Sequence, residues 1–316
     1  MSTTVVPMPA PTKPRHPQAL PAYAAVVVGF MVLVILEGAI VRATGSGAGC
    51  GNHWPLCNGE FFPHHPRLAT IIEYTHRSMT GLCTTLVAIL IGWTFLARPS
   101  GDRARRAVVW SGILLITEAL LGAILVKGGY VENNASDMRV VMQCIHFTNT
   151  MLLLAAIAIT WWWLRDRPQP PTSYIPQTRT AAWLAFGATL IVGATGSVAA
   201  LADTLFPPTS LQAAILQDFA AHSPLLVRMR WLHPASALIA LCCAIWLALQ
   251  LRGTLGRLLL GLIGVQLILG ALDVLLLAPT WMQMLHLLGA DLYWIALVAT
   301  CATVLAPQPL ITAEAQ

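Results

Sequence analysis

The sequence predicts an all-α integral membrane protein, with eight transmembrane helices arranged as two four-helix bundles related by a pseudo-two-fold axis. Only 10% of the 316 residues are charged and 57% are hydrophobic, whereas a soluble domain carries about 25% charged residues. Eight apolar stretches are each about 20 residues long, which is enough to cross a bilayer. Short motifs also recur in the same order in both halves of the chain. The lipid bilayer is therefore the expected solvent of this protein.

The apolar stretches define the expected helices and the segments that join them. The predicted spans are 22–42, 69–96, 107–127, 139–164, 181–201, 229–250, 256–278 and 284–306. The first four form an N-terminal bundle at 22–164, and the last four form a C-terminal bundle at 181–306. Residues 1–21 and 307–316 are expected to be tails, and 165–180 a linker. Pro279 marks the turn between the last two spans.

Lys and Arg residues predict how the chain is oriented. Most of the 18 basic residues lie in the N-terminal tail and in three connections, 97–106, 165–180 and 251–257. Short loops rich in Lys and Arg stay in the cytoplasm. Both tails and the linker are therefore predicted to be cytoplasmic, in a multi-pass protein of the cell (inner) membrane. The net charge of +5 is modest. It is interpreted as a signal of how the chain is oriented in the membrane, and no nucleic-acid partner is predicted.

An internal repeat supports the two-bundle arrangement, because three short matches occur in the same order in both halves. Both halves have four spans, so the repeat is parallel and its axis runs along the membrane normal. The matches are Ala43-Thr44-Gly45-Ser46 with Ala194-Thr195-Gly196-Ser197, Gly122-Ala123 with Gly270-Ala271, and Gln143-Cys144-Ile145-His146 with Gln283-Met284-Leu285-His286.

Four of the nine histidines lie in apolar spans, near the outer ends of the second, fourth, sixth and eighth helices. They are His76, His146, His233 and His286. A single one would most simply hydrogen-bond a neighbouring helix, but four at matched depth predict metal ligands, since ionisable residues in membrane helices usually mark function. Imidazole is a good axial ligand of heme iron, and no carboxylate or thiolate cluster completes a zinc site. One heme per half is predicted, with His76 paired with His146 and His233 paired with His286.

Arginines accompany these histidines near the predicted outer surface. Guanidinium groups bind carboxylates well, so these arginines are candidates for holding heme propionates that face outward. Ordinary snorkelling of the long side chains at helix ends remains the alternative. The candidates are Arg42, Arg77, Arg139 and Arg230.

Glu73 is the candidate catalytic acid. It precedes His76 by three residues and so shares its helix face, where a carboxylate could deliver protons or polarise a substrate. The matching position before His233 is Arg230, so the two halves share ligands but differ in chemistry. A structural ion pair with Arg77 or Arg42 is the alternative. Glu37, in the first span, has a weaker claim.

Cys50 and Cys57 form the candidate cysteine pair, in the first outer loop. A disulfide is chemically allowed on this oxidising side of the membrane, and the intervening Gly, Asn and Pro residues suit a tight loop. The pair would either staple the loop or exchange with a thiol carrier, and both readings remain open.

Together these motifs resemble the heme A synthase family. The resemblance rests on the stretch from Glu37-Gly38 through Arg42 to Gly47, the Cys50–Cys57 pair, Glu73-Tyr74-Thr75-His76-Arg77, and the later histidines. It implies that the N-terminal half binds the substrate heme O and that the C-terminal half holds a resident heme b. It also implies an oxidoreductase that converts the C8 methyl of heme O to a formyl by two hydroxylations, with loss of water from the geminal diol. Glu73 matches the essential glutamate of that family.

The chain departs from the family pattern in one place. Many bacterial members have a second cysteine pair between the fifth and sixth helices, but residues 202–228 contain no cysteine. A mechanism that needs four outer cysteines is therefore not expected. A quinol-linked diheme b-type cytochrome and a membrane transporter are the competing functions. The electron donor, a heme O synthase partner and a homo-oligomeric state remain open.

Overall fold

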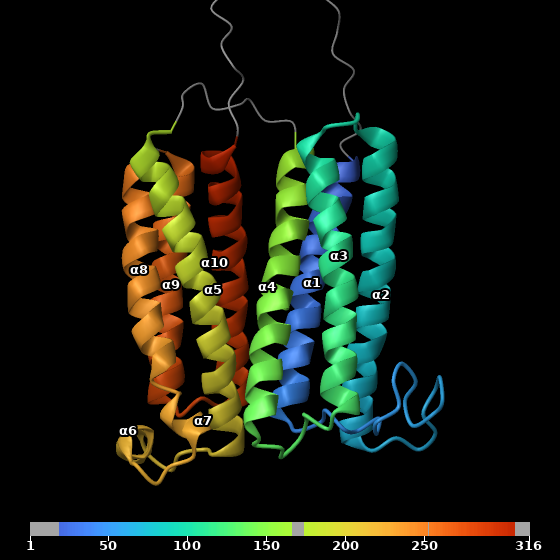
Figure 1. Ribbon diagram of the computed structural model, residues 1–316, viewed down its shortest axis with the longest axis vertical. Helices are drawn as coiled ribbons and strands as arrows, with labels where there is room; N and C mark the ends of the chain where they lie inside the picture. The colour runs from blue at the N-terminus through green and yellow to red at the C-terminus, as the bar shows by residue number, and fades with distance from the viewer. Residues whose placement is uncertain (1–18, 166–173, 252, 307–316) are drawn as a thin grey trace, which may run out of the picture.

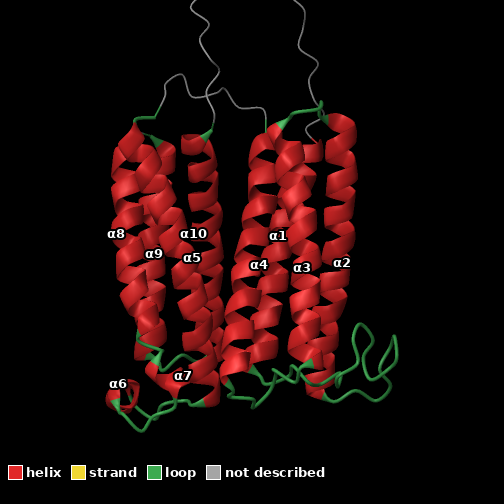
Figure 2. Cartoon of the chain, viewed as in Figure 1, coloured by secondary structure: helices red, strands yellow, loops and turns green. Residues whose placement is uncertain are grey.

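The computed structural model describes residues 19–165, 174–251 and 253–306, and all regular structure within these ranges is helical (Figure 1, Figure 2). The all-α membrane fold predicted from the sequence is confirmed. Most of both predicted tails, and part of the linker, lie outside the described residues. The helices are α1 (Ala19–Ala43), α2 (Leu68–Ala97), α3 (Arg103–Lys127), α4 (Asp137–Leu164), α5 (Pro176–Leu205), α6 (Leu211–Phe219), α7 (Leu225–Arg228), α8 (Leu232–Gln250), α9 (Thr254–Leu275) and α10 (Thr280–Leu305).

Eight segments of the described chain are long and apolar enough to cross a membrane, as predicted. The sixth, Leu225–Gln250, consists of α7 and α8 joined by a turn at residues 229–231. The fifth begins at Pro176, whereas the sequence placed its start at 181. The linker is therefore shorter than expected, because a proline at the first helical position favours helix initiation even where the following residues are polar.

The short helix α6 was not predicted from the sequence. It lies in the loop between α5 and α7, and the Ser210 side chain caps it by accepting a hydrogen bond from the Ala213 backbone at 3.1 Å. Nine residues are too few to cross a bilayer, so α6 belongs to the surface of the bundle.

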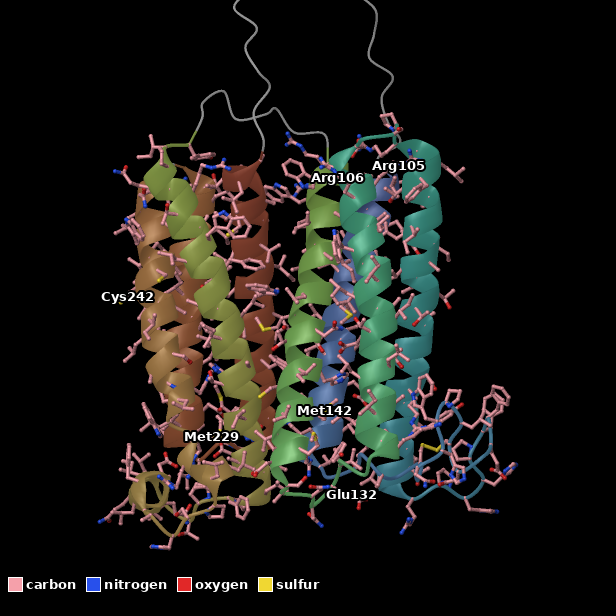
Figure 3. All side chains as sticks on the ribbon, in the orientation of Figure 1. Arg105, Arg106, Glu132, Met142, Met229 and Cys242 are labelled. Atoms are coloured by element: carbon pink, nitrogen blue, oxygen red, sulfur yellow. A yellow bond between two sulfur atoms is a disulfide. The ribbon has the colours of Figure 1, made fainter. Side chains whose placement is uncertain are left out.

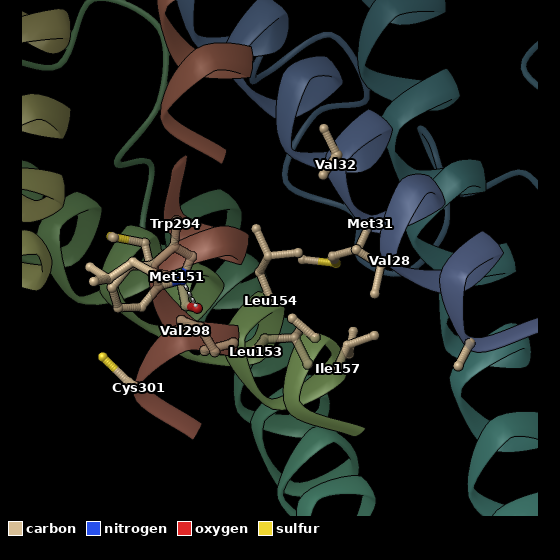
Figure 4. Close-up of a cluster of buried hydrophobic side chains, with 14 of the residues drawn as sticks. Val28, Met31, Val32, Met151, Leu153, Leu154, Ile157, Trp294, Val298 and Cys301 are labelled. Atoms are coloured by element: carbon tan, nitrogen blue, oxygen red, sulfur yellow. Dashed lines mark hydrogen bonds between the residues drawn. The ribbon is translucent and has the colours of Figure 1, made fainter. Parts of the chain in front are cut away.

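The spans form two groups that lie side by side, α1–α4 in one and α5, α8, α9 and α10 in the other (Figure 1). The groups meet where α1 and α4 contact α5 and α10. Their pseudo-two-fold relation stays a prediction. The seam is apolar (Figure 4): Leu153, Leu154 and Ile157 of α4 are buried, and Trp294 of α10 donates a hydrogen bond to the Met151 carbonyl at 2.9 Å. Large apolar side chains such as Leu249 point outward instead, as expected for a lipid-facing surface.

The two ends of the bundle differ in their connections. Both described chain ends and the α2–α3 turn lie at one end, where Arg105 and Arg106 project (Figure 3). The long loops 44–67, 128–136 and 206–224 lie at the other end, which carries Glu132. This separation agrees with the predicted topology, and the cytoplasmic assignment of the first end stays a prediction.

Candidate functional site

Each of the four membrane histidines lies against a glycine of a neighbouring helix. A Cβ atom added at Gly38, Gly196 or Gly270 would lie only 3.0 Å from the Cε1 atom of the facing imidazole, and one at Gly122 would lie 3.8 Å away. Small residues allow this kind of close approach between membrane helices. The four pairs are His76 (α2) on Gly38 (α1), His146 (α4) on Gly122 (α3), His233 (α8) on Gly196 (α5), and His286 (α10) on Gly270 (α9).

The histidines are brought together in the pairs predicted from the sequence. The rings of His233 and His286 have centroids 6.2 Å apart and planes 80° apart. Metal–imidazole bonds are about 2.0–2.1 Å long, so two imidazoles on one ion have centres about 6 Å apart. His76 and His146 lie within electrostatic range of each other in the other half. The C-terminal half therefore has two imidazoles at the spacing of ligands to one metal, and the N-terminal half has two imidazoles close enough to interact electrostatically.

The chemistry of these pairs fits heme. Within the described residues no three His, Cys, Asp or Glu side chains gather as a metal site, so a metal here would have two protein ligands. Heme iron needs only axial ligands from the protein, because the porphyrin fills the other four positions. The Nδ1 atoms of His76 and His146 are buried without a hydrogen-bond partner, and Nδ1 of His233 lies 3.3 Å from the Val192 carbonyl. Among the described residues no hydrogen bond occupies Nε2 of these three imidazoles, so that nitrogen is available to iron.

Glu73 is buried at 3% exposure and contacts the loop 44–67. Its Oε2 accepts a hydrogen bond from the Cys50 backbone at 2.7 Å, and its Oε1 forms an ion pair with Arg77 at 2.5 Å. The ion pair considered as the alternative is therefore present with Arg77. Glu73 fixes the loop to the helix that carries His76, three residues away.

The predicted disulfide is present, with an S–S distance of 1.99 Å between Cys50 and Cys57. Its loop is held by three further hydrogen bonds, which two residues of α2 donate. Arg77 Nη1 donates to the carbonyls of His53 and Leu56 at 2.5 and 2.7 Å, and the Thr70 hydroxyl donates to the Gly49 carbonyl at 2.7 Å. The loop, the disulfide and Glu73 thus form one unit at the end of the N-terminal half that carries the long loops.

Arg42 joins the two halves. Its Nη1 donates to the Ala200 carbonyl at 2.6 Å and the Thr204 hydroxyl at 2.5 Å, both on α5. Its Nη2 donates to Gln283 Oε1 at 2.7 Å, on α10 one turn before His286. Arg42, a candidate for binding a heme propionate, therefore contacts the C-terminal half, although its own helix belongs to the N-terminal half.

The remaining candidate arginines also have protein partners. Arg230 contacts Asp203 of α5 at 2.8 Å and Asp218 of α6 at 2.7 Å, so these two acids neutralise it. Arg139 is buried and donates to the carbonyls of Glu132 and Asn134. All four candidate arginines lie at the end of the bundle that carries the long loops, which is the end predicted to face outward.

Comparison with known proteins gives the family. Residues 22–298 match the model of the cytochrome oxidase assembly protein family. The chain belongs to this family. The resemblance seen in the motifs is thereby confirmed, and it extends over most of the sequence.

Individual relatives match it over shorter shares of their own length. A Thermus thermophilus protein named protoheme IX farnesyltransferase is 42% identical over 293 residues, which are 88% of this chain and 47% of that protein. Proteins named heme A synthase from Alkalihalophilus pseudofirmus and Bacillus pumilus are 36% and 39% identical over 129 and 132 residues. These matches cover 41% of this chain, and 41% and 39% of those proteins. The chain thus spans less than half the length of these relatives.

One of the three repeat matches is wrong. Gly45 was paired with Gly196, but it lies in the turn after α1 with φ of +64° and nothing near its Cβ position. The glycine that faces a histidine as Gly196 does is Gly38. The identical letters Ala-Thr-Gly-Ser at the two places therefore reflect chance, whereas contact with the ligand identifies the equivalent position.

The sequence analysis also missed two polar residues beside the histidines. Glu118 Oε1 lies 3.5 Å from His146 Nδ1, and Gln266 Nε2 lies 3.1 Å from His286 Nδ1. Each precedes by four residues the glycine that faces the same histidine, Gly122 or Gly270. The sequence does contain a signal for both residues. Gly122-Ala123 repeats as Gly270-Ala271, and the position one helical turn before each glycine is Glu118 in one half and Gln266 in the other.

Proposed function

We propose that this protein is a heme A synthase, an oxidoreductase that converts the C8 methyl of heme O to a formyl group by successive hydroxylations. The observation that carries the proposal is an asymmetry. Both halves have two of the membrane histidines, but among the described residues only the N-terminal half has a buried glutamate three residues before one of them, Glu73, together with a disulfide loop that is hydrogen-bonded to it. The names of the heme A synthase relatives support the same reaction.

The N-terminal half would bind the substrate. His76 and His146 would hold heme O, with the loop of Cys50 and Cys57 covering the outer side of the site. Glu73 lies one helical turn from His76, where it would hold a proton or polarise the reacting group. The buried ion pair with Arg77 would keep this carboxylate in place.

The C-terminal half would hold a resident heme b between His233 and His286. A bound heme supplies one-electron transfer. The protein residues would orient it: Gly196 and Gly270 admit the imidazoles, and the Val192 carbonyl accepts a hydrogen bond from His233 Nδ1, which leaves Nε2 to bind iron. Arg42 would link this site to the substrate half, with Arg77, Arg139 and Arg230 available to propionates at the outer ends.

We further propose the inner membrane as the location, with the heme sites near its outer side and both termini in the cytoplasm. The Thermus thermophilus relative suggests the partner. It is about twice as long as this chain's match and is named for adding a farnesyl group to protoheme IX. That reaction yields a farnesylated heme such as heme O, so a heme O synthase is the expected supplier of substrate.

The test is heme extraction after expression with a supply of heme O. A quinol-linked diheme cytochrome would bind hemes without making the formyl heme, and a transporter would show no heme absorption. Heme A in the extract supports the proposal, and heme b and heme O without heme A would count against it.

A Glu73→Gln variant tests the acid. Heme A should fall by roughly 10²–10⁴-fold, the typical contribution of a general acid or base, while heme b stays near the wild-type amount and heme O or a hydroxylated product accumulates. Glu60→Gln is the matched control in the same loop region, where a hydrogen bond from His64 lowers the pKa of the exposed Glu60 carboxyl. Near-normal heme A from Glu73→Gln would show that the charge is not catalytic, and loss of heme b would make Glu73 structural.

A further inference from the structure

Glu118 and Gln266 occupy equivalent places in the two halves. Glu118 lies on α3 one turn before Gly122, and Gln266 lies on α9 one turn before Gly270. Each side chain approaches Nδ1 of the histidine on the next helix, His146 at 3.5 Å and His286 at 3.1 Å. The two halves therefore have the same contact with different chemistry, a carboxylate in one and an amide in the other.

Glu118 is fixed in position by residues of the histidine helix. Asn149 Nδ2 donates to Oε2 at 2.6 Å, and the Thr150 hydroxyl donates to Oε1. Asn149 is itself oriented, because its Oδ1 accepts from the Thr117 hydroxyl at 2.8 Å. Donors directed at both oxygens are the surroundings of a group that only accepts hydrogen bonds.

A carboxylate in this place determines which nitrogen of His146 is free. Because Glu118 can only accept, it favours the tautomer with the proton on Nδ1, and the Nε2 lone pair is left for iron. At 3.5 Å the contact between Glu118 Oε1 and His146 Nδ1 is electrostatic and longer than a hydrogen bond. Carboxylates that accept from a metal-bound histidine also make that ligand more basic.

Gln266 has a weaker effect on His286. Its amide nitrogen donates to the His286 carbonyl at 3.2 Å and lies near both ring nitrogens, 3.1 Å from Nδ1 and 3.4 Å from Nε2. A neutral amide oxygen accepts a hydrogen bond less strongly than a carboxylate. The neighbour of His286 is therefore neutral, whereas the neighbour of His146 is a carboxylate.

We propose that Glu118 is a positioning residue that makes His146 a stronger donor than His286, so that the iron of the N-terminal half is held more firmly in the ferric state. The inference rests on the proposed heme sites and deepens the proposed function, because it gives the substrate half its own iron chemistry. Glu118 acts through His146 and is not expected to touch the reacting methyl group.

The experiment exchanges the two groups and measures the reduction potential of each heme in purified, heme-loaded protein. Glu118→Gln should weaken the ferric preference of the N-terminal heme by about tenfold, the lower end of the usual effect of such partners. That change is a rise of about 59 mV for a one-electron couple. Gln266→Glu should lower the potential of the C-terminal heme by a similar amount. In each variant the unaltered half is the internal control.

The outcomes separate the inference from the proposed function. Potentials that move as described support the inference, even if wild-type protein makes no heme A and the proposed function fails. Unchanged potentials in both variants overturn it, even if heme A forms normally. If Glu118→Gln protein loses the N-terminal heme, Glu118→Asp is the deciding variant: retention of that heme by Glu118→Asp supports the carboxylate role, and equal loss overturns it.

Discussion

The contact between Gly196 and His233 predicts what one added methyl group would do. A Cβ in Gly196→Ala would lie 3.0 Å from Cε1 and 3.1 Å from Nδ1 of His233, whereas ordinary contacts begin at 3.4 Å. The imidazole must therefore withdraw by about 0.4 Å, the margin between those two distances, which also lengthens its 3.3 Å contact with the Val192 carbonyl.

The magnitude follows from the cost of overpacking. Adding one carbon to a packed site typically costs about 1–3 kcal/mol, and each 1.4 kcal/mol is tenfold in affinity, so heme b binding should weaken roughly 5- to 150-fold. Gly187→Ala is the matched control, because it lies on the same helix with nothing within 4 Å of its Cβ position.

The assay is titration of heme-depleted protein with heme b, followed by absorbance and by heme content per polypeptide. The reasoning is refuted if Gly196→Ala binds heme b with wild-type affinity. It is equally refuted if Gly187→Ala weakens binding as much, since the loss would then come from the helix and not from the ligand contact.

Two further predictions concern the ligands and the disulfide. His233→Ala or His286→Ala should remove most of the heme b from purified protein. His76→Ala should leave the heme b in place, because the two histidine pairs lie in different halves. Full retention of heme b in both C-terminal variants would contradict the assignment. Alkylation without reduction should leave Cys50 and Cys57 unmodified in mass spectra, because they are bonded in the folded protein; two alkylated thiols at these positions would contradict the staple.

The membrane fold and the four intramembrane histidines could be predicted from the sequence because the signals are local. A transmembrane span needs only a run of apolar residues. A histidine stands out within such a run because it is an ionisable residue among apolar ones. The disulfide was equally accessible, since both cysteines lie in one short loop. Helix starts were less accurate: α5 begins among polar residues whose hydropathy hides the helix, although Pro176 marks it.

The sequence by itself predicted that lipid surrounds this chain, that four histidines lie at a similar depth, and that a glutamate precedes His76 where an arginine precedes His233. The tertiary structure alone decided the partners. Arg42, on α1, donates hydrogen bonds to Thr204 on α5 and Gln283 on α10. Glu118, on α3, approaches His146 on the neighbouring helix α4. Long polar side chains can satisfy their hydrogen bonds with any neighbour within reach, so their partners depend on how helices pack. Packing also identified Gly38, in place of Gly45, as the counterpart of Gly196. The glycine that leaves room for an imidazole depends on which two helices lie against each other, and the sequence of one helix does not show that.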